Sequence, residues 1–318
     1  MRRHPLVAIA LVCLVIALTR GSAAHADAPR KVVVGTYLNH VTGIDIKNNS
    51  FAVDFYVWFR WEGDDLKPLE TFELANGRIT SKSGIQKKKL GSQNYAACRV
   101  LATMTKFWDL RRFPLDSHTL TLEIEDSEQD DRTVVYQPDA DNTGVSPELQ
   151  VPGWVVARSR AEVMRQVYHT NYGDTSLPSN KESAYSRYLF SVDVARPGYG
   201  RFLKVFFGLF ISVLISWCAF YVRPKESSPR VSLGMGATFA AAAVTVAINN
   251  SLPDTNAVTM ADKLIMLTLA IIVASVAVTI AALTLFAHGK EGIQKQLDFY
   301  CSILFPAVYL ATLYFIVA

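Results

Sequence analysis

The sequence is poor in cysteine and holds no pattern that would build a disulfide framework. Four of its 318 residues are cysteine. Cys13, Cys218 and Cys301 lie in apolar runs, and Cys98 stands alone in the polar half of the chain. A single cysteine cannot close an intramolecular disulfide in that half, even in a compartment that permits such bonds.

Residues that mark enzymes and nucleic-acid-binding proteins are also scarce. His40, His118, His169 and His288 are scattered, without the spacing of metal ligands. Neither a G-x-S-x-G motif nor a phosphate-binding loop occurs. The charge is nearly balanced and no basic stripe is present, which disfavours nucleic acid as a partner. We therefore expect no cofactor and no metal, and a membrane-anchored periplasmic enzyme is the least favoured function.

The N-terminus has the pattern of a secretory signal peptide. A basic start, "MRRHP", precedes the apolar run "LVAIALVCLVIAL" and the small residues of "AAHADAP". The apolar run is short for a membrane span, although a single-pass anchor is the alternative. The pattern predicts a signal peptide over residues 1–26 and a mature chain that starts near Asp27, outside the cytoplasm.

A change in composition near residue 200 divides the mature chain into two domains. Residues 201–318 hold four apolar runs of about 20 residues, the length that crosses a bilayer. The predicted helices are 202–222, 231–250, 263–286 and 297–318. The first and third linkers, "RPKESSPR" and "AHGKEGIQKQ", are basic, whereas the second is acidic. The positive-inside rule therefore places these two linkers in the cytoplasm and the N-terminal domain outside.

Residues 27–200 have the alternation of antiparallel strands. In "FAVDFYVWFRW" the apolar face consists of Phe51, Val53, Phe55, Val57, Phe59 and Trp61. The runs "HTLTLEIE" and "YLFSVDV" alternate in the same way. Several such runs separated by turns predict an immunoglobulin-like β-sandwich.

The second predicted span is rich in small residues and carries polar ones. Polar groups within a membrane often face a water-filled cavity, although tight packing of small residues is an alternative for this span. Steps of three and four residues define one face, the predicted pore stripe: Ser232, Gly236, Phe239, Ala243, Val246 and Asn250. A ring of Phe239 side chains could gate such a pore by dewetting, or Phe239 could pack against a neighbouring helix.

These features together resemble the pentameric ligand-gated ion channels, the Cys-loop receptor superfamily, in its prokaryotic form. The most specific motif is the turn Phe113-Pro114-Leu115-Asp116. Others are "LFISVLISW", "RVSLGMGATF", "NNSLPDT" and the "PGW" that ends at Trp154. Lys106 and Leu120 occupy the positions where animal members form a disulfide. "LETFELANG" replaces a tryptophan–x–proline–aspartate motif of the family, which leaves the first binding loop unassigned.

The resemblance implies a homopentamer in the bacterial inner membrane, with a periplasmic ligand-binding domain and a pore for monovalent ions. It also implies an agonist site between subunits. Aromatic and acidic side chains suit a cation, so an amine, calcium or protons are the expected agonists. The candidate residues are Tyr56, Trp58 and Arg60 on one subunit, and Glu125, Asp126, Glu128, Tyr168, Tyr172 and Tyr185 on the other. Burial of a subunit interface and a solvated acidic loop are the alternatives.

The resemblance also implies a gating interface where the two domains meet. Its candidate residues are Asp45, Phe113, Pro114, Asp116, Arg196 and Pro253. We expect Arg196 to pair with Asp116 and to hold the turn over the linker near Pro253. A pair that only supports folding is the alternative.

Ion selectivity is ambiguous in the sequence. Glu226 lies too early for an acidic ring at the inner mouth, where Ser228 and Pro229 stand, and Arg230 begins the helix. "PRVSLG" resembles the anion-selective branch, so anion or weak selectivity is favoured. A non-conducting sensor with the same fold is the alternative function.

Overall fold

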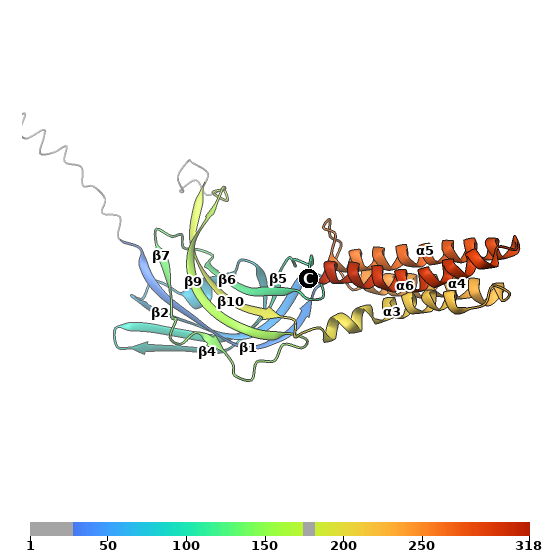
Figure 1. Cartoon of the computed structure of the whole chain (residues 1–318). Helices are drawn as coiled ribbons and strands as arrows, with labels where there is room; N and C mark the ends of the chain where they lie inside the picture. The colour runs from blue at the N-terminus through green and yellow to red at the C-terminus, as the bar shows by residue number, and fades with distance from the viewer. Residues whose placement is uncertain (1–27, 174–181) are drawn as a thin grey trace, which may run out of the picture.

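The computed structural model describes residues 28–173 and 182–318. Figure 1 shows an elongated molecule in which a strand-rich domain leads into a bundle of helices. The predicted signal peptide, residues 1–26, lies outside the described residues. The boundary between strands and helices falls at Gly200, where the first long helix begins.

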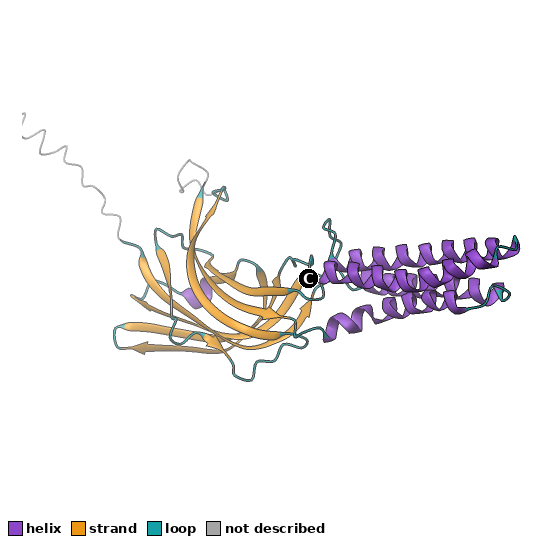
Figure 2. Cartoon of the chain, viewed as in Figure 1, coloured by secondary structure: helices purple, strands orange, loops and turns teal. Residues whose placement is uncertain are grey.

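The N-terminal domain consists of two sheets packed face to face (Figure 2). One sheet has the order β4-β5-β2-β1-β7, with the short β8 also paired to β1. Its strands are β1 (Arg30–Asp45), β2 (Ser50–Glu62), β4 (Gly77–Leu90), β5 (Gln93–Thr105), β7 (Val134–Pro138) and β8 (Gly144–Val145). The other sheet has the order β3-β6-β10-β9. Its strands are β3 (Phe72–Leu74), β6 (Ser117–Asp126), β9 (Val155–Tyr168) and β10 (Ser183–Ala195), and a short helix, α2 (Pro68–Thr71), precedes β3.

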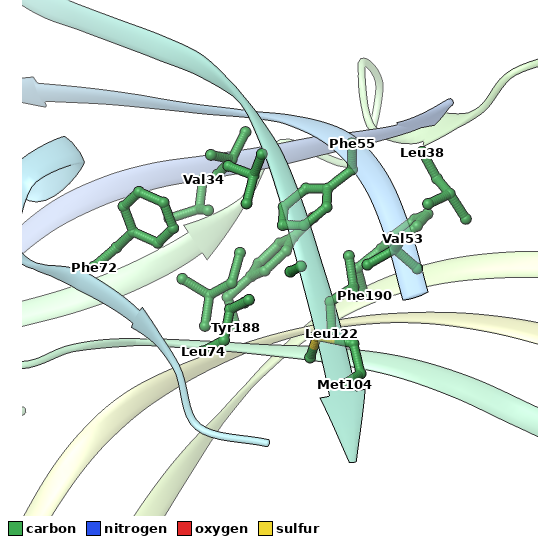
Figure 3. Packing of buried hydrophobic residues seen from close by; sticks show 14 of the residues in the cluster. Val34, Leu38, Val53, Phe55, Phe72, Leu74, Met104, Leu122, Tyr188 and Phe190 are labelled. Carbon is green, nitrogen blue, oxygen red and sulfur yellow. The ribbon is translucent and has the colours of Figure 1, made fainter. Parts of the chain in front are cut away.

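The core of the sandwich comes from the faces that the alternation predicted. Phe51, Phe55 and Phe59 of β2 are buried in one cluster with Leu122 of β6 and Phe190 of β10. Figure 3 shows Phe55 in this core with Leu122 and Phe190. Each large apolar side chain buried in this way contributes about 1.5–3 kcal/mol to folding. Trp61 is the exception, because it lies at the end of β2 and is only partly buried. The predicted β-sandwich is confirmed.

The C-terminal domain is a bundle of four long helices (Figure 2), each apolar enough to cross a membrane. They are α3 (Gly200–Cys218), extended by the 3-10 turn η1 (Ala219–Tyr221), then α4 (Ser227–Asn250), α5 (Met260–Ala287) and α6 (Glu291–Val317). The predicted starts of the last three helices are too late. Each helix begins earlier, among polar residues that carry no hydropathy signal. At α5 a capping box between Thr259 and Asp262 sets the start.

The two domains meet at the turn between β5 and β6. Leu110 and Phe113 are buried in the same apolar cluster as Phe202 of α3 and Met260 of α5. The backbone N–H of Met260 also donates to the carbonyl of Arg111 at 2.9 Å. The turn is therefore anchored in the outer end of the helix bundle by its own side chains.

Candidate ligand site, gating interface and pore helix

Three of the predicted aromatic residues come together at the edge of the four-stranded sheet. Tyr168 ends β9, Tyr185 lies on β10, and Tyr172 lies in the loop between these strands. The ring centroid of Tyr168 lies 5.9 Å from that of Tyr172 and 5.9 Å from that of Tyr185, both edge-on. We call these three residues the tyrosine cluster. Its ring faces and edges offer the arrangement that attracts an ammonium group.

Glu125 lies next to the tyrosine cluster and already has partners. It is buried on β6 and accepts hydrogen bonds from the hydroxyl of Tyr168 at 2.9 Å and from Nε of Arg187 at 2.5 Å. Arg187 also donates to Glu123 at 2.5 Å and to the Tyr168 hydroxyl at 2.6 Å. Burial, followed by the hydrogen bond to Glu125, raises the pKa of Tyr168 to about 12. Its phenol is therefore a neutral donor at physiological pH.

Sequence reasoning did not include Arg187 in the site. The alternation of β10 places Arg187 on the outward face with Tyr185, because Tyr188 and Phe190 are on the core face. Two carboxylates surround this one guanidinium, so the group of Glu123, Glu125 and Arg187 keeps an excess negative charge.

Asp126 and Glu128 have different environments from Glu125. Asp126 is buried and accepts hydrogen bonds from the Thr71 hydroxyl at 2.6 Å and from the backbone N–H groups of Glu128 and Gln129 at 3.0 and 2.9 Å. It therefore stabilises its own loop, and Glu128 is exposed on that loop. Across the described residues, no group of three or more His, Cys, Asp or Glu is placed to hold a metal ion. Within one chain, Glu125, Asp126 and Glu128 do not form a calcium site.

The predicted residues of β2 lie on the outward face of the six-stranded sheet. Tyr56 is 41% exposed. Nε1 of Trp58 donates to Asp139 at 2.9 Å, and a guanidinium nitrogen of Arg60 donates to the same carboxylate oxygen at 3.1 Å. The indole of Trp58 lies across Gly35 of β1, where an added Cβ would come within 2.3 Å of the ring. Gly35 and Asp139, which sequence reasoning missed, therefore fix the position of Trp58.

The tyrosine cluster and the Tyr56–Trp58–Arg60 face belong to different sheets of the sandwich. Each lies on the outward side of its sheet, and the apolar core separates them. One chain therefore does not bring these two sets together.

At the domain boundary the predicted pair of Arg196 and Asp116 is present, as part of a larger group. Nε of Arg196 lies 3.5 Å from Asp116, and both side chains are buried. The second oxygen of Asp116 lies 2.6 Å from Nε2 of His118. The ring of His118 is held edge-on by Trp108 and Trp154, with centroids at 4.9 and 5.4 Å.

The charges in this group are balanced by their neighbours. The Arg196 guanidinium stacks 3.6 Å from the ring centroid of Trp154. Burial lowers the pKa of Arg196 to about 10, against the opposing effect of the Asp116 charge. Burial raises the pKa of Asp116, but the His118 hydrogen bond and the Arg196 charge outweigh burial, and the pKa lies below its usual value. Asp116 is therefore a buried anion with two cationic or hydrogen-bonding partners.

The remaining predicted gating residues have separate surroundings. Phe113 is buried against the helices, and its peptide bond to Pro114 is cis. Asp45 accepts hydrogen bonds from the backbone and side-chain nitrogens of Asn48 at 3.0 and 2.7 Å, which closes the loop between β1 and β2. The turn accepts a hydrogen bond from Met260, at the start of α5. Leu252, next to Pro253, packs against the apolar cluster that contains Phe113.

The pore stripe predicted on α4 is exposed along its whole length. All six of its residues are exposed, and Phe239 is 71% exposed. The opposite face of α4 packs against the other helices through Arg230, Gly234, Ala237, Ala241 and Ile248. The hydroxyls of Thr238 and Thr245 donate to backbone carbonyls one turn earlier, both at 2.9 Å. The side of α4 that carries the stripe is therefore left uncovered by the residues that the structure describes.

No protein-family model matches the chain. The chain is similar to the proton-gated ion channel of Gloeobacter violaceus, with 23% identity over 280 residues, which cover 80% of this chain and 74% of the relative. A match over 80% of the chain includes residues of both the sandwich and the helices. These similarities support a pentameric ligand-gated ion channel, at low identity.

Other relatives are animal members of this family. The chain is 23% identical over 167 residues to the human gamma-aminobutyric acid receptor subunit rho-1. It is 24% identical over 170 residues to the human rho-2 subunit. Each match covers 52% of the chain and about a third of the rho subunit (32% and 33%). These relatives are ion channels, so the protein is a membrane channel homologue and not an enzyme.

In this pentameric ligand-gated ion channel homologue, Arg230 lies on the packed face of α4. Its side chain is fully buried and forms an ion pair with Asp298 of α6, with a further hydrogen bond to the carbonyl of Val222 at 3.4 Å. Gln294 also donates to Asp298. The charged residue of "PRVSLG" is therefore on the side of α4 that faces α6, away from the pore stripe.

Proposed function

We propose that this protein is a ligand-gated ion channel that assembles as a homopentamer in a bacterial inner membrane. Its N-terminal domain faces the periplasm, and α4 lines the pore. The observation that carries the proposal is the pore stripe of α4, which is exposed along its length while the opposite face packs in the bundle. A face that is polar at its ends and apolar between suits a ring of helices around a water-filled axis.

The agonist site of this channel lies between neighbouring subunits. The tyrosine cluster of one copy and the Tyr56–Trp58–Arg60 face of the next form its two walls. The support is that these two sets lie on outward faces of different sheets, separated by the core in a single chain. Ring closure of identical subunits joins unlike faces in this manner.

The agonist is a small organic amine. An ammonium group fits against the three tyrosine rings, and the excess negative charge of Glu123 and Glu125 over Arg187 attracts it. Tyr56 and Trp58 supply aromatic contacts from the second subunit. The rho subunits among the relatives are named as receptors for gamma-aminobutyric acid, which is an amine.

Protons are the second candidate agonist. The relative in Gloeobacter violaceus is named a proton-gated channel. In this chain the buried hydrogen bond between Asp116 and His118 joins two titratable groups directly at the domain boundary. A proton that binds there would change the charge beside the turn that anchors the helices.

Gating links the agonist site to the helix bundle through the turn between β5 and β6. Agonist binding changes the position of β10, which carries Tyr185 at one end and leads at the other to Arg196. Arg196 holds Asp116 in the turn, and the turn is bonded to the start of α5. A two-state contact of this kind is what coupling between distant sites requires.

Current recordings from the purified full-length protein in planar bilayers test this function. We expect currents with one or more members of an amine panel that includes gamma-aminobutyric acid, and a weaker response in E125Q. The matched control is E148Q, which removes an exposed carboxylate outside both walls. A native mass that corresponds to any number of subunits other than five would contradict the assembly. Binding of amines without current at any ligand concentration or pH would favour the non-conducting sensor.

A further inference from the structure

A pocket of about 1080 Å³ opens at the edge of the sandwich, where the chain crosses from one sheet to the other. The crossing segment is Ala75 and Asn76, between β3 and β4. The end of β5 forms one wall of this edge pocket, and the outward face of β6 forms the other. Glu123 is the only residue that the edge pocket shares with the proposed agonist site.

Hydrogen bonds of Asn76 fix the shape of the edge pocket. Its side-chain Nδ2 donates to the carbonyl of Thr121 at 2.9 Å, and its Oδ1 accepts from the backbone N–H of Glu123 at 3.2 Å. The carbonyl of Asn76 accepts from the backbone N–H of Thr105 at 2.7 Å. One residue therefore ties β5 of one sheet to β6 of the other, so the walls are in place before a ligand binds.

Arg78 and Lys106 bring positive charge to the edge pocket from two different strands. Arg78 is exposed near the start of β4, and Lys106 is partly buried just after the end of β5. Nζ of Lys106 lies 5.4 Å from the ring centroid of Trp108, and burial lowers the pKa of its ammonium group. Among the residues that the structure describes, neither cation lies within ion-pair distance of a carboxylate. An anion in the pocket would supply the counter-charge that a partly desolvated cation needs.

The charges around the edge pocket favour an anion with a single charge. Glu123 is the one carboxylate among the described lining residues, and it is paired with Arg187. Arg187 also pairs with Glu125, so these three residues together carry one net negative charge. Arg78 and Lys106 carry two positive charges, which leaves one positive charge in excess. A carboxylate matches this excess, whereas a phosphate monoester carries roughly −1.5 to −2 at pH 7.

Hydroxyl groups and an exposed aromatic ring complete the edge pocket. Thr103 lies opposite Arg78 in the strand ladder, and Thr105 precedes Lys106, so each cation has a hydroxyl donor beside it in register or in sequence. The planar guanidinium of Arg78 suits the two oxygens of a carboxylate. Phe107 also lines the pocket and is 83% exposed, so its ring can contact the body of a ligand.

We infer that the edge pocket binds the carboxylate of a small organic acid that has an aromatic body. Lys106 and Arg78 contact the carboxylate, and the hydroxyls of Thr103 and Thr105 donate to it. The ring of the acid packs against Phe107. This site is separate from the proposed agonist site, which attracts a cation.

Isothermal titration calorimetry of the solubilised full-length protein tests this site. The probes are benzoate, benzamide, which has the same ring without the charge, and acetate, which has the same charge without the ring. We expect benzoate to bind, benzamide to give no binding heat, and acetate to bind about tenfold more weakly than benzoate. R78Q and K106Q should each weaken benzoate binding about tenfold, which corresponds to about 1.4 kcal/mol. F107A should weaken benzoate binding to the level of acetate and leave acetate binding unchanged.

Two further variants separate loss of charge at this pocket from general effects. K88Q is the matched control, because Lys88 is an exposed lysine of β4 that does not line the pocket. We expect K88Q to bind benzoate as the unmodified protein does. K106R keeps the positive charge and should bind benzoate within about twofold of the unmodified protein.

Several results would overturn the inference. No binding heat with benzoate, or equal binding of benzamide, would remove the requirement for a carboxylate. Unchanged affinity in R78Q and K106Q, or an equal loss in K88Q, would remove the assigned residues. A loss in K106R as large as that in K106Q would assign the effect to altered packing. Displacement of benzoate by an equal concentration of inorganic phosphate would indicate a general anion site.

The experiment also distinguishes this site from the proposed channel function. Loss of benzoate binding in R60Q, with normal binding in K106Q, would place the acid at the agonist site and overturn the edge pocket as its location. The heat of binding does not depend on current, so a negative result here would leave the proposed channel function standing.

Discussion

The carboxylate of Asp116 lies between His118 and Arg196, 2.6 Å from Nε2 of His118 and 3.5 Å from Nε of Arg196. All three side chains are buried where the sandwich meets the helix bundle. The turn therefore keeps its form without a disulfide, through packing of Phe113 and this group of charges.

Neutralising Asp116 should destabilise the domain boundary. D116N leaves Arg196 as a buried cation without its counter-charge, and breaking a buried pair on one side costs about 3–5 kcal/mol. We expect a clearly lower midpoint of thermal unfolding in the full-length protein, and loss of gating. D109N is the control, because Asp109 pairs with Arg111 at the exposed surface and should change the midpoint little. Equal midpoints for D116N and the unmodified protein would contradict the role of this pair.

The same carboxylate should make stability depend on acid pH. The pKa of Asp116 in the folded protein lies below its ordinary value of 3.8. Its contribution to stability is therefore present above pH 3.8 and is lost as the pH falls through the lower, folded-state pKa. We expect the free energy of unfolding to decline below this pH, and D116N to show a shallower decline. If the free energy of unfolding fell in parallel with pH in D116N and in the unmodified protein, Asp116 would be excluded as the source of the pH dependence.

Shortening Phe239 should open the proposed gate. F239A removes the largest side chain of the pore stripe, so water can enter the apolar section more readily and the open state is favoured. We expect a several-fold increase in current without agonist. M235A is the control, because Met235 is an exposed apolar residue of α4 that lies off the stripe. The same low resting current in both variants would show that Phe239 does not close the pore.

Adding a methyl group at Gly35 should displace Trp58. The Cβ of G35A would come within 2.3 Å of the indole, so the ring must move away from Asp139. Overpacking of this kind costs about 1–3 kcal/mol, and the response to an amine agonist should weaken. G43A is the matched control, since nothing lies within 4 Å of a Cβ added at Gly43 in the same strand. An unchanged dose–response curve in G35A would remove Trp58 from the agonist site.

Replacing Arg230 should affect folding without changing ion selectivity. R230Q leaves Asp298 without its ion-pair partner inside the bundle, which should lower the thermal midpoint markedly. Arg230 faces α6 and not the pore stripe, so the reversal potential in asymmetric salt should stay the same. R223Q, which changes an exposed arginine of the linker before α4, is the control for stability. A shifted reversal potential in R230Q would show that the arginine reaches the ion path.

The sequence by itself determined the features that repeat along the chain. The two-residue alternation of β2 predicted which of its side chains are buried, because neighbouring residues of a strand point to opposite faces. The apolar runs predicted four helices, because a bilayer requires long apolar segments. The steps of three and four residues in α4 predicted a stripe that is exposed from Ser232 to Asn250.

Only the tertiary structure decided the partners of individual charged and polar groups. Arg230 is buried against Asp298 of α6, Asp126 stabilises its own loop, and Asp139 holds Trp58. His118 belongs to the candidate gating interface and Arg187 to the candidate ligand site. Both belong there through contacts that periodicity does not encode. Local spacing determines which face a side chain occupies, whereas the register of strands and the packing of helices determine which distant residue lies opposite. These long-range arrangements also bring Arg187 to Glu125 and so neutralise that carboxylate in part.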